Sequence, residues 1–567
     1  MPRTDASGVI RARIPAGAGN VCRRIYPGAV VKQPSPARPA RIEVFRHLFA
    51  ALTEEMGAAL RRSAFSPNIK ERRDYSCALF DGAGRVVSLG DHMPVHLGAM
   101  PMSVGAIRDT LGELGPGDVA AVNDPFLGGT HLPDITLVSA VHTTERAKPI
   151  GLVASRAHHA DVGGSAPGSM PLVREVFQEG LRIPPVLLLR AGLRVDGVWR
   201  LILANVRTPL EREADLQAQI ASLDAGRRRL LDIVERVGAD AVREAMELMR
   251  AYGDRLLAEG IDRIPDGTYA GEDVLDDDGM GNGPLPIRVS IRVEGSRASV
   301  DFRESADQAE GGVNAVAAIA VSCVRYAFRC VAERLLGVSL PAGGGDMERV
   351  EVLLRDGSIV AARPPAAVAA GNVETSQRIA DVLFEAFSVA LPDLIPAQSQ
   401  GTMNNVTVGG TDPRTGETFA YYETVGGGAG AGPSGPGLSG AHVHMSNSLN
   451  TPIEALEHAY PVRVVAYGLR RGSGGKGLHR GGDGLRREVR MLTDVDVNLL
   501  GERRVRGPRG RAGGGEGQPG RDAVRADGVE RAVPSKGAIR LKAGDELVIL
   551  TPGGGGWGAR QSTPSAS

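Results

Sequence analysis

The spacing of apolar residues changes abruptly near residue 42 and predicts a series of long helices beyond it. From Ile42 to Leu60, apolar residues recur every three or four positions, which is typical of an amphipathic helix. The same period covers residues 209–236 and 239–259, with Pro209 near the start of the first segment and Gly238 between the two. Two further buried helices are predicted over residues 313–336 and after Thr375.

Short apolar runs between these helices predict strands. Runs of this kind cover residues 75–80, 86–89, 119–122, 135–141 and 150–155.

A second pattern, strict alternation over residues 287–293, is followed by a turn and by residues 298–302, which predicts a hairpin. From about residue 466 the chain is strand-like and rich in glycine. The order of elements therefore predicts a mixed α+β protein with several domains.

We predict four parts along the chain. Residues 1–40 are rich in Arg, Pro and Ala, lack periodicity and form a disordered leader. Their Arg content is also typical of a transit peptide, and an overlong reading frame explains them equally well. Residues 41–265 form a sheet-based domain with long helices, and residues 266–465 form a central α/β domain. Residues 466–567 form a β-rich, glycine-rich C-terminal region.

Composition excludes several classes of function. Lys plus Arg and Asp plus Glu both number 66, so no net charge directs the chain to nucleic acid or to an anionic membrane. No run of apolar residues reaches the length of a membrane span. The four cysteines are too few and too scattered for a disulfide framework or a thiolate zinc site. These features favour a cytoplasmic protein.

Candidate chemistry is concentrated at the ends of the predicted strands. Asn123-Asp124 follows one strand, His131-Leu132-Pro133-Asp134 precedes another, and His158-His159 follows a third. Loops at strand ends commonly carry functional residues. Six of the 11 histidines lie in this region: His92, His96, His131, His142, His158 and His159. Because neutral imidazole and carboxylate bind divalent metals, the region indicates a metal-assisted enzyme.

Each candidate also has an ordinary structural interpretation. His131 and Asp134 lie three apart across Pro133, which predicts a tight turn that holds two ligands of one ion or, alternatively, a turn capped by Asp134. If His158 and His159 do not bind a metal, they are expected to be two solvated loop residues. Glu71 lies between Lys70 and Arg72, and these neighbours alone favour a surface ion pair.

The glycine-rich segments do not match a nucleotide-binding motif. The sequence contains no G-x-x-x-x-G-K-[ST], and residues 472–477 lack the required Ser or Thr. A G-x-S-x-G nucleophile motif is also absent. Glycine runs of this kind more often allow backbones to approach closely.

Taken in order, the motifs from Ile42 to Gly558 resemble the hydantoinase B family. This family comprises the B subunits or domains of N-methylhydantoinases and 5-oxoprolinases, and it is related to the metal-bearing subunits of acetone and acetophenone carboxylases. The matching motifs are Asn68–Ser76, Gly90–Gly98, Asn123–Asp134, His158–Gly164, Gly371–Ser376, Tyr422–Thr424, Gly426–Gly428, Ser473–Gly475 and Thr551–Gly556. The sequence departs from the family at Gly501–Arg504, where a more aromatic continuation is usual.

The resemblance implies a divalent metal (Mn, Zn or Fe) bound by four residues. Carried over by motif, these residues are Glu71, His131, Asp134 and His158. His158 is preferred to His159 because the family places a histidine three positions before the aspartate of Asp161-Val162-Gly163-Gly164. As residues that relay protons or orient a ligand, His159, Asp161 and Asp124 are equal candidates.

The resemblance also implies a partner. Family members act with an A subunit that binds ATP with Mg and phosphorylates the substrate. We therefore expect a hetero-oligomer in which this chain hydrolyses a lactam or cyclic imide such as 5-oxoproline or hydantoin. One alternative is a subunit of an ATP-dependent carboxylase of the acetone or acetophenone type. An alternative of another class is a non-catalytic structural subunit with a closed metal site.

Overall fold

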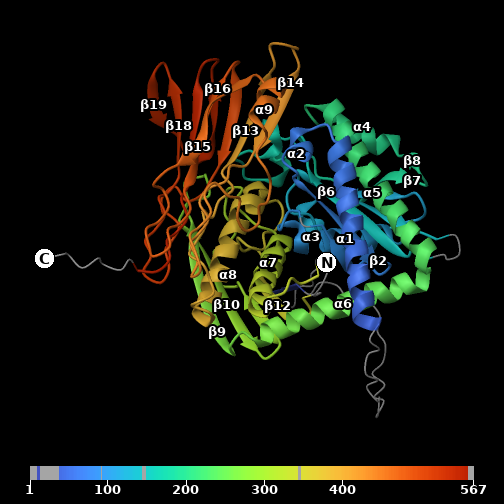
Figure 1. Ribbon diagram of the computed structural model, residues 1–567. Helices are drawn as coiled ribbons and strands as arrows, with labels where there is room; N and C mark the ends of the chain where they lie inside the picture. The colour runs from blue at the N-terminus through green and yellow to red at the C-terminus, as the bar shows by residue number, and fades with distance from the viewer. Residues whose placement is uncertain (1–8, 13–36, 91, 144–147, 342–346, 560–567) are drawn as a thin grey trace.

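The computed structural model describes residues 9–12, 37–90, 92–143, 148–341 and 347–559, which build four β-sheets with helices between them (Figure 1). The predicted mixed α/β, multi-domain architecture is confirmed. Of the described helices, none has the length and apolar character that crossing a bilayer requires.

The first sheet has seven antiparallel strands in the order β3-β2-β6-β5-β4-β7-β8. Its strands are β2 (Tyr75–Asp81), β3 (Val86–Leu89), β4 (Val119–Val122), β5 (Asp134–Val141), β6 (Gly151–His158), β7 (Val186–Arg190) and β8 (Leu193–Arg194). Both faces of its central strands are buried. Cys77 and Leu79 belong to the main apolar core, whereas Ala78 and Phe80 pack in a separate cluster on the opposite face.

Helices cover both faces of this sheet. Helices α1 (Ala37–Ser63) and α5 (Pro209–Val237) pack together and contact β2, β5 and β6. Helix α3 (His96–Leu111) places Met100, Val104 and Ile107 against the opposite face. Burial on both sides explains why these strands are continuous apolar runs rather than alternating ones. Shorter helices α2 (Pro67–Lys70) and α4 (Asp196–Ala204) and the long α6 (Ala239–Asp262) complete this part.

The second sheet has five strands in the order β1-β12-β11-β10-β9. They are β1 (Val9–Ala12), β9 (Gly267–Leu275), β10 (Leu285–Glu294), β11 (Arg297–Asp301) and β12 (Val350–Arg355). Helix α8 (Ser376–Ala390) packs on β9 and β10, and α7 (Ala317–Leu336) packs between α8 and α3. A π-helical turn at Gly371–Thr375 leads into α8. One apolar core joins these helices to the first sheet.

The C-terminal half contains two sheets that share one apolar core, the orange and red strands of Figure 1. One has the order β14-β13-β17-β20: β13 (Asn405–Thr411), β14 (Thr418–Glu423), β17 (Val495–Leu500) and β20 (Lys536–Leu541). The other has the order β15-β16-β21-β18-β19: β15 (Val462–Arg470), β16 (Gly484–Met491), β18 (Arg521–Ala526), β19 (Val529–Ala532) and β21 (Glu546–Leu550). Helix α9 (Ile453–Ala459) precedes β15.

Two features differ from the predicted division of the chain. Strand β13 pairs with β17, although the predicted boundary at residue 465 separates them. Val9–Ala12, within the predicted leader, forms a strand that pairs with β12. The rest of the leader up to residue 36 lies outside the described residues. Both differences involve partners far apart in sequence, which local periodicity does not report.

The glycine-rich segments of this half run side by side. Gly475 donates its backbone N–H to Gly554, Gly554 donates to Gly482, and Gly556 donates to Gly515. A Cβ atom at Gly554 would overlap the backbone oxygen of Ala429. These glycines therefore permit close backbone approach, as their sequence predicts.

Candidate metal centre

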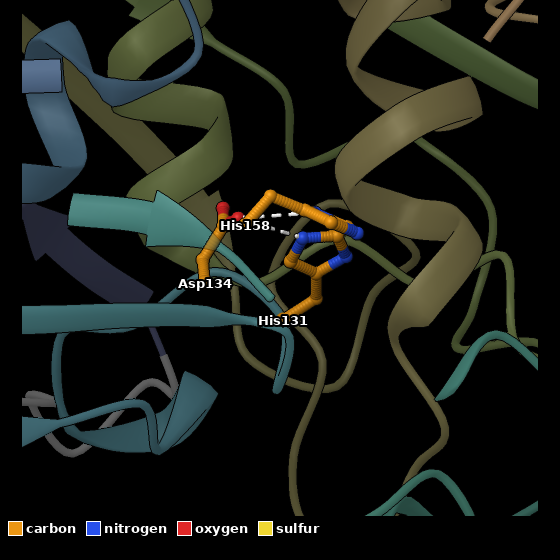
Figure 2. Close-up of side chains that lie close together, drawn as sticks. All are labelled: His131, Asp134 and His158. Carbon is orange, nitrogen blue, oxygen red and sulfur yellow. Dashed lines mark ion pairs between the residues drawn. The ribbon is translucent and has the colours of Figure 1, made fainter. Parts of the chain in front are cut away.

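Three of the sequence-predicted metal ligands converge where two central strands of the first sheet, β5 and β6, begin and end (Figure 2). Asp134 begins β5 and His158 ends β6, and the two are register partners in adjacent antiparallel strands. His131 precedes Asp134 in a tight turn closed by the bond from the Asp134 N–H to the His131 oxygen, 3.2 Å. Each residue offers one ligand atom, and these atoms all lie within 4.8 Å of one another.

Asp134 is the centre of this group. Its Oδ1 lies 3.1 Å from His131 Nε2 and 3.3 Å from His158 Nδ1. Its Oδ2 accepts a hydrogen bond from Thr130 Oγ1 at 2.9 Å and lies 3.3 Å from His96 Nε2. His96 Nδ1 lies 2.8 Å from Ser76 Oγ. All these side chains are buried, so a charge on Asp134 needs the partners that surround it.

The protonation states of the group suit metal binding. Burial by itself raises the pKa of Asp134, but the charge of His131 and hydrogen bonds from the histidines outweigh it and hold the pKa well below its usual range. Burial lowers the pKa of His158 and of His96. An ionised Asp134 beside the neutral imidazoles of His158 and His96 provides donors of the kind that divalent metals bind.

The space at the centre also fits an ion. A cavity of about 10 Å³ lies against Asp134, His158 and His96, enough for one water molecule. His131 Nδ1, His158 Nε2 and Asn372 Oδ1 are buried polar atoms without a hydrogen-bond partner. Such atoms are uncommon in protein interiors and are frequent where an ion or water is bound.

Residues from other parts of the chain also line the cavity. Asn372, in the π-helical turn, places Nδ2 3.1 Å from His131 Nε2. The ring of Tyr422, from β14, stacks on His158 with centroids 4.5 Å apart. The guanidinium carbon of Arg72 lies 4.8 Å from the centroid of the Tyr422 ring, and Arg72 Nη1 donates to the Tyr422 backbone oxygen at 2.9 Å. The centre therefore lies where three parts of the chain meet.

The fourth predicted ligand, Glu71, is not part of the group. It is half-buried at the end of α2 and does not line the cavity. Asp74, three residues later in the same motif, is buried and does line it. Asp74 is not among the site residues predicted from the sequence.

The three candidate relay residues are engaged elsewhere. His159 points to the other side of the sheet, where Nε2 lies 2.9 Å from Gln219 Oε1 on α5. Asp161 pairs with Arg207 at 2.8 Å. Asp124 accepts a hydrogen bond from the Phe126 backbone, and burial raises the pKa of its carboxyl.

Three further residues at the centre, His96, Asn372 and Tyr422, are also not among the site residues predicted from the sequence. All three lie in motifs that carried the resemblance, and this was the signal that could have identified them. Membership of a motif shows that a residue matters, but the contact that each one makes is set by the tertiary fold.

Thr130→Val should weaken metal binding about 10-fold or more, because it removes the hydroxyl that fixes Asp134 Oδ2 while keeping the shape of the side chain. Competition with a coloured chelator measures this affinity. Thr53→Val is the matched control, since Thr53 is equally buried and donates to a backbone oxygen of its own helix. Equal affinity in the two variants would show that Thr130 does not support the ligand.

The chain belongs to the Hydantoinase B/oxoprolinase family, whose model matches residues 38–560. It is 37% identical over 572 residues to 5-oxoprolinase 1 of Arabidopsis thaliana, covering 95% of this chain but 43% of that protein. It is 30% identical over 543 residues to the caprolactamase subunit beta of Pseudomonas jessenii, covering 93% of this chain and 92% of that subunit.

Two solved structures share the fold. The crystal structure of ATP-dependent caprolactamase from Pseudomonas jessenii matches with a TM-score of 0.82 and 27% identity, over 92% of this chain and 91% of that one. A nucleotide-free structure of acetone carboxylase matches with a TM-score of 0.81 and 17% identity, over 92% of this chain and 76% of that one. The second likeness concerns the fold alone.

Proposed function

We propose that this chain is the metal-dependent hydrolytic component of an ATP-dependent cyclic amidase. The observation that carries the proposal is the convergence of His131, Asp134 and His158 beside a water-sized cavity that Asp134 and His158 line, in a chain of the Hydantoinase B/oxoprolinase family. The substrates are lactams or cyclic imides such as 5-oxoproline or hydantoin.

The proposal includes a partner that binds ATP. This chain spans 43% of the plant 5-oxoprolinase but nearly the whole caprolactamase subunit beta. We infer that a separate A subunit, like the remainder of the longer relative, uses Mg-ATP to phosphorylate the amide oxygen. The two chains form a hetero-oligomer.

His131, Asp134 and His158 would hold a divalent ion such as Mn, Zn or Fe. When bound, such an ion lowers the pKa of a bound water toward about 7 and polarises the electrophilic carbon. Tyr422 keeps the His158 ring in place by stacking, and Thr130 and His96 orient the second oxygen of Asp134.

The chain's own residues also control water and protons. Burial of the centre limits water to the small cavity. Asp74, the other carboxylate that lines this cavity, is placed to accept a proton from the attacking water. One water adds to the activated carbon and the C–N bond breaks, which leaves the ring-opened amine with its carboxyl as an acyl phosphate. A second water hydrolyses this acyl phosphate, and phosphate leaves. In total, one cyclic amide, one ATP and two waters give the open-chain acid with its amine, ADP and phosphate.

The isolated chain should give no heat on titration with Mg-ATP, because the proposal assigns nucleotide binding to the partner. The same titration of the assembled complex should show binding. Micromolar affinity of the isolated chain for ATP would contradict this division of labour.

The proposal is tested by purifying the chain with its ATP-binding subunit and assaying 5-oxoproline, hydantoin, caprolactam and acetone. We expect ATP-dependent ring opening of at least one cyclic amide, without bicarbonate. Consumption of acetone that requires bicarbonate would favour the carboxylase alternative, whose fold is shared. Full activity of a complex in which this chain is metal-free would contradict the metal dependence of the proposed function.

A further inference from the structure

One π-helical turn, Gly371–Thr375, lies beside the metal centre and carries two buried polar side chains, Asn372 and Glu374. Asn372 lines the metal cavity, and its Nδ2 lies 3.1 Å from His131 Nε2. Turns of this type are rare in proteins and are frequent at functional sites. The turn therefore contacts one imidazole of the centre directly.

The second imidazole, His158, packs against a tyrosine that is fixed at both ends. The Tyr422 ring stacks on His158 with an angle of 19° between the ring planes. Arg72 Nη1 donates to the Tyr422 backbone oxygen, and the Tyr422 hydroxyl donates to Asn405 Oδ1 at 2.8 Å. Because the lone pair of an imidazole nitrogen lies in the ring plane, the tilt of the His158 ring sets the direction in which it can bind an ion. The position of the Tyr422 ring therefore affects the metal centre.

The amide of Asn405 is oriented by two acceptors. Its Nδ2 donates to Glu374 Oε1 at 2.7 Å and to the Leu500 backbone oxygen at 2.8 Å. Because an amide nitrogen only donates, both bonds fix Nδ2 on this side and leave Oδ1 to accept from Tyr422. Asn405 is buried at the start of β13, where these bonds are shielded from solvent.

Glu374 connects the π-helical turn to this amide. Besides Asn405 Nδ2, Glu374 Oε1 accepts the backbone N–H of Met403 at 2.9 Å, and Met403 lines the metal cavity. Burial raises the pKa of Glu374 to about 8, so its carboxyl group is largely neutral at pH 7. The two bonds of Glu374 therefore need an acceptor oxygen but not a negative charge.

We propose that the π-helical turn orients both imidazoles of the metal centre, with Glu374 and Asn405 as positioning residues. Asn372 acts on His131 directly. Glu374 acts on the second imidazole through Asn405 and the Tyr422 ring. The inference rests on the metal centre of the proposed function and adds to it two residues that act through others.

Chelator competition for Zn²⁺ on the isolated full-length chain tests this path with Tyr422→Phe, which keeps the stacked ring and removes only the hydroxyl. We expect Zn²⁺ affinity to fall about 10-fold, the lower end of the range for groups that orient metal ligands. Tyr421→Phe is the matched control, because Tyr421 is also buried on β14 but donates its hydroxyl to Thr451 and does not line the metal cavity. It should bind Zn²⁺ as the wild type does.

Substitutions of Glu374 separate a positioning role from a general loss of packing. Glu374→Leu should also weaken Zn²⁺ binding about 10-fold, since it removes the acceptor of Asn405. Glu374→Gln should bind Zn²⁺ as the wild type does, because Gln keeps the acceptor oxygen and is neutral. Tyr422→Phe added to Asn405→Leu should cause no further loss, since Asn405→Leu already breaks the same hydrogen bond.

Wild-type affinity in Tyr422→Phe, an equal loss in Tyr421→Phe, or equal losses in Glu374→Gln and Glu374→Leu would each overturn the path. A wild-type chain that binds no Zn²⁺ would overturn it together with the metal centre. If the variants behave as expected although the assembled complex opens no cyclic amide, the positioning role stands and the proposed function is refuted. If the complex opens cyclic amides but Tyr422→Phe binds Zn²⁺ like the wild type, the positioning role is refuted and the proposed function stands.

Discussion

Asp134→Asn is expected to leave the purified chain without its metal and the assembled complex without ring-opening activity. Asp134 contacts three imidazoles and one hydroxyl, and it is the only one of the three converging ligands that carries a negative charge. Loss of groups that merely orient a metal ligand typically costs about 10–100-fold, so loss of the ligand charge should exceed about 100-fold in metal affinity. Elemental analysis and a chelator competition measure this loss.

The matched control for this change is Asp232→Asn, which removes the same charge from an exposed position on α5. It should retain wild-type metal content and activity. Both variants should remain folded, which circular dichroism can verify. If Asp134→Asn retained stoichiometric metal with native affinity, Asp134 would have to be removed from the ligand set.

Arg72→Met should produce the largest loss of stability among single changes near the centre. Arg72 is fully buried and donates to Tyr422 O and to Thr424 Oγ1, both at 2.9 Å. Its Nη2 also lies 3.9 Å from Asp74. Removing one member of a buried charged group leaves its partners unpaired and costs about 3–5 kcal/mol. Denaturant unfolding should show this decrease in the free energy of unfolding.

The same variant should also weaken metal binding, because Tyr422 stacks on His158 and Arg72 anchors the backbone of Tyr422. Lys70→Met, two residues earlier and exposed, is the control and should change neither property. Wild-type stability in Arg72→Met would mean that the contacts between β14 and the first sheet do not depend on this guanidinium.

Sequence periodicity predicted two of the long helices closely because it is a local property, whereas α3 (His96–Leu111) was not predicted. The segments 209–236 and 239–259 correspond to α5 (Pro209–Val237) and α6 (Ala239–Asp262). The strand pairing of β13 with β17 was not predictable in this way, since it joins residues about 90 positions apart. Strand pairing depends on which surfaces meet after collapse, and one strand's pattern does not specify its partner.

The arrangement of the candidate site, like the strand pairing, could be predicted only in part from the sequence. His158 and His159 are neighbours in sequence, but their side chains lie on opposite sides of the sheet, and only the register with β5 places His158 beside Asp134. The family resemblance implied Glu71 as a ligand, whereas the residue of this motif that lines the cavity is Asp74. Asn372 and Tyr422 come from other parts of the chain, and their proximity to His131 and His158 is a consequence of tertiary packing.

Anomalous diffraction at the absorption edge of the co-purified metal would test the central claim most directly. Crystals of the full-length chain should give one strong anomalous peak in contact with His131, Asp134 and His158, beside the small cavity that Asp74 lines. A peak at another position, or none here in protein that carries one equivalent of metal, would contradict the proposed centre and the hydrolytic function built on it.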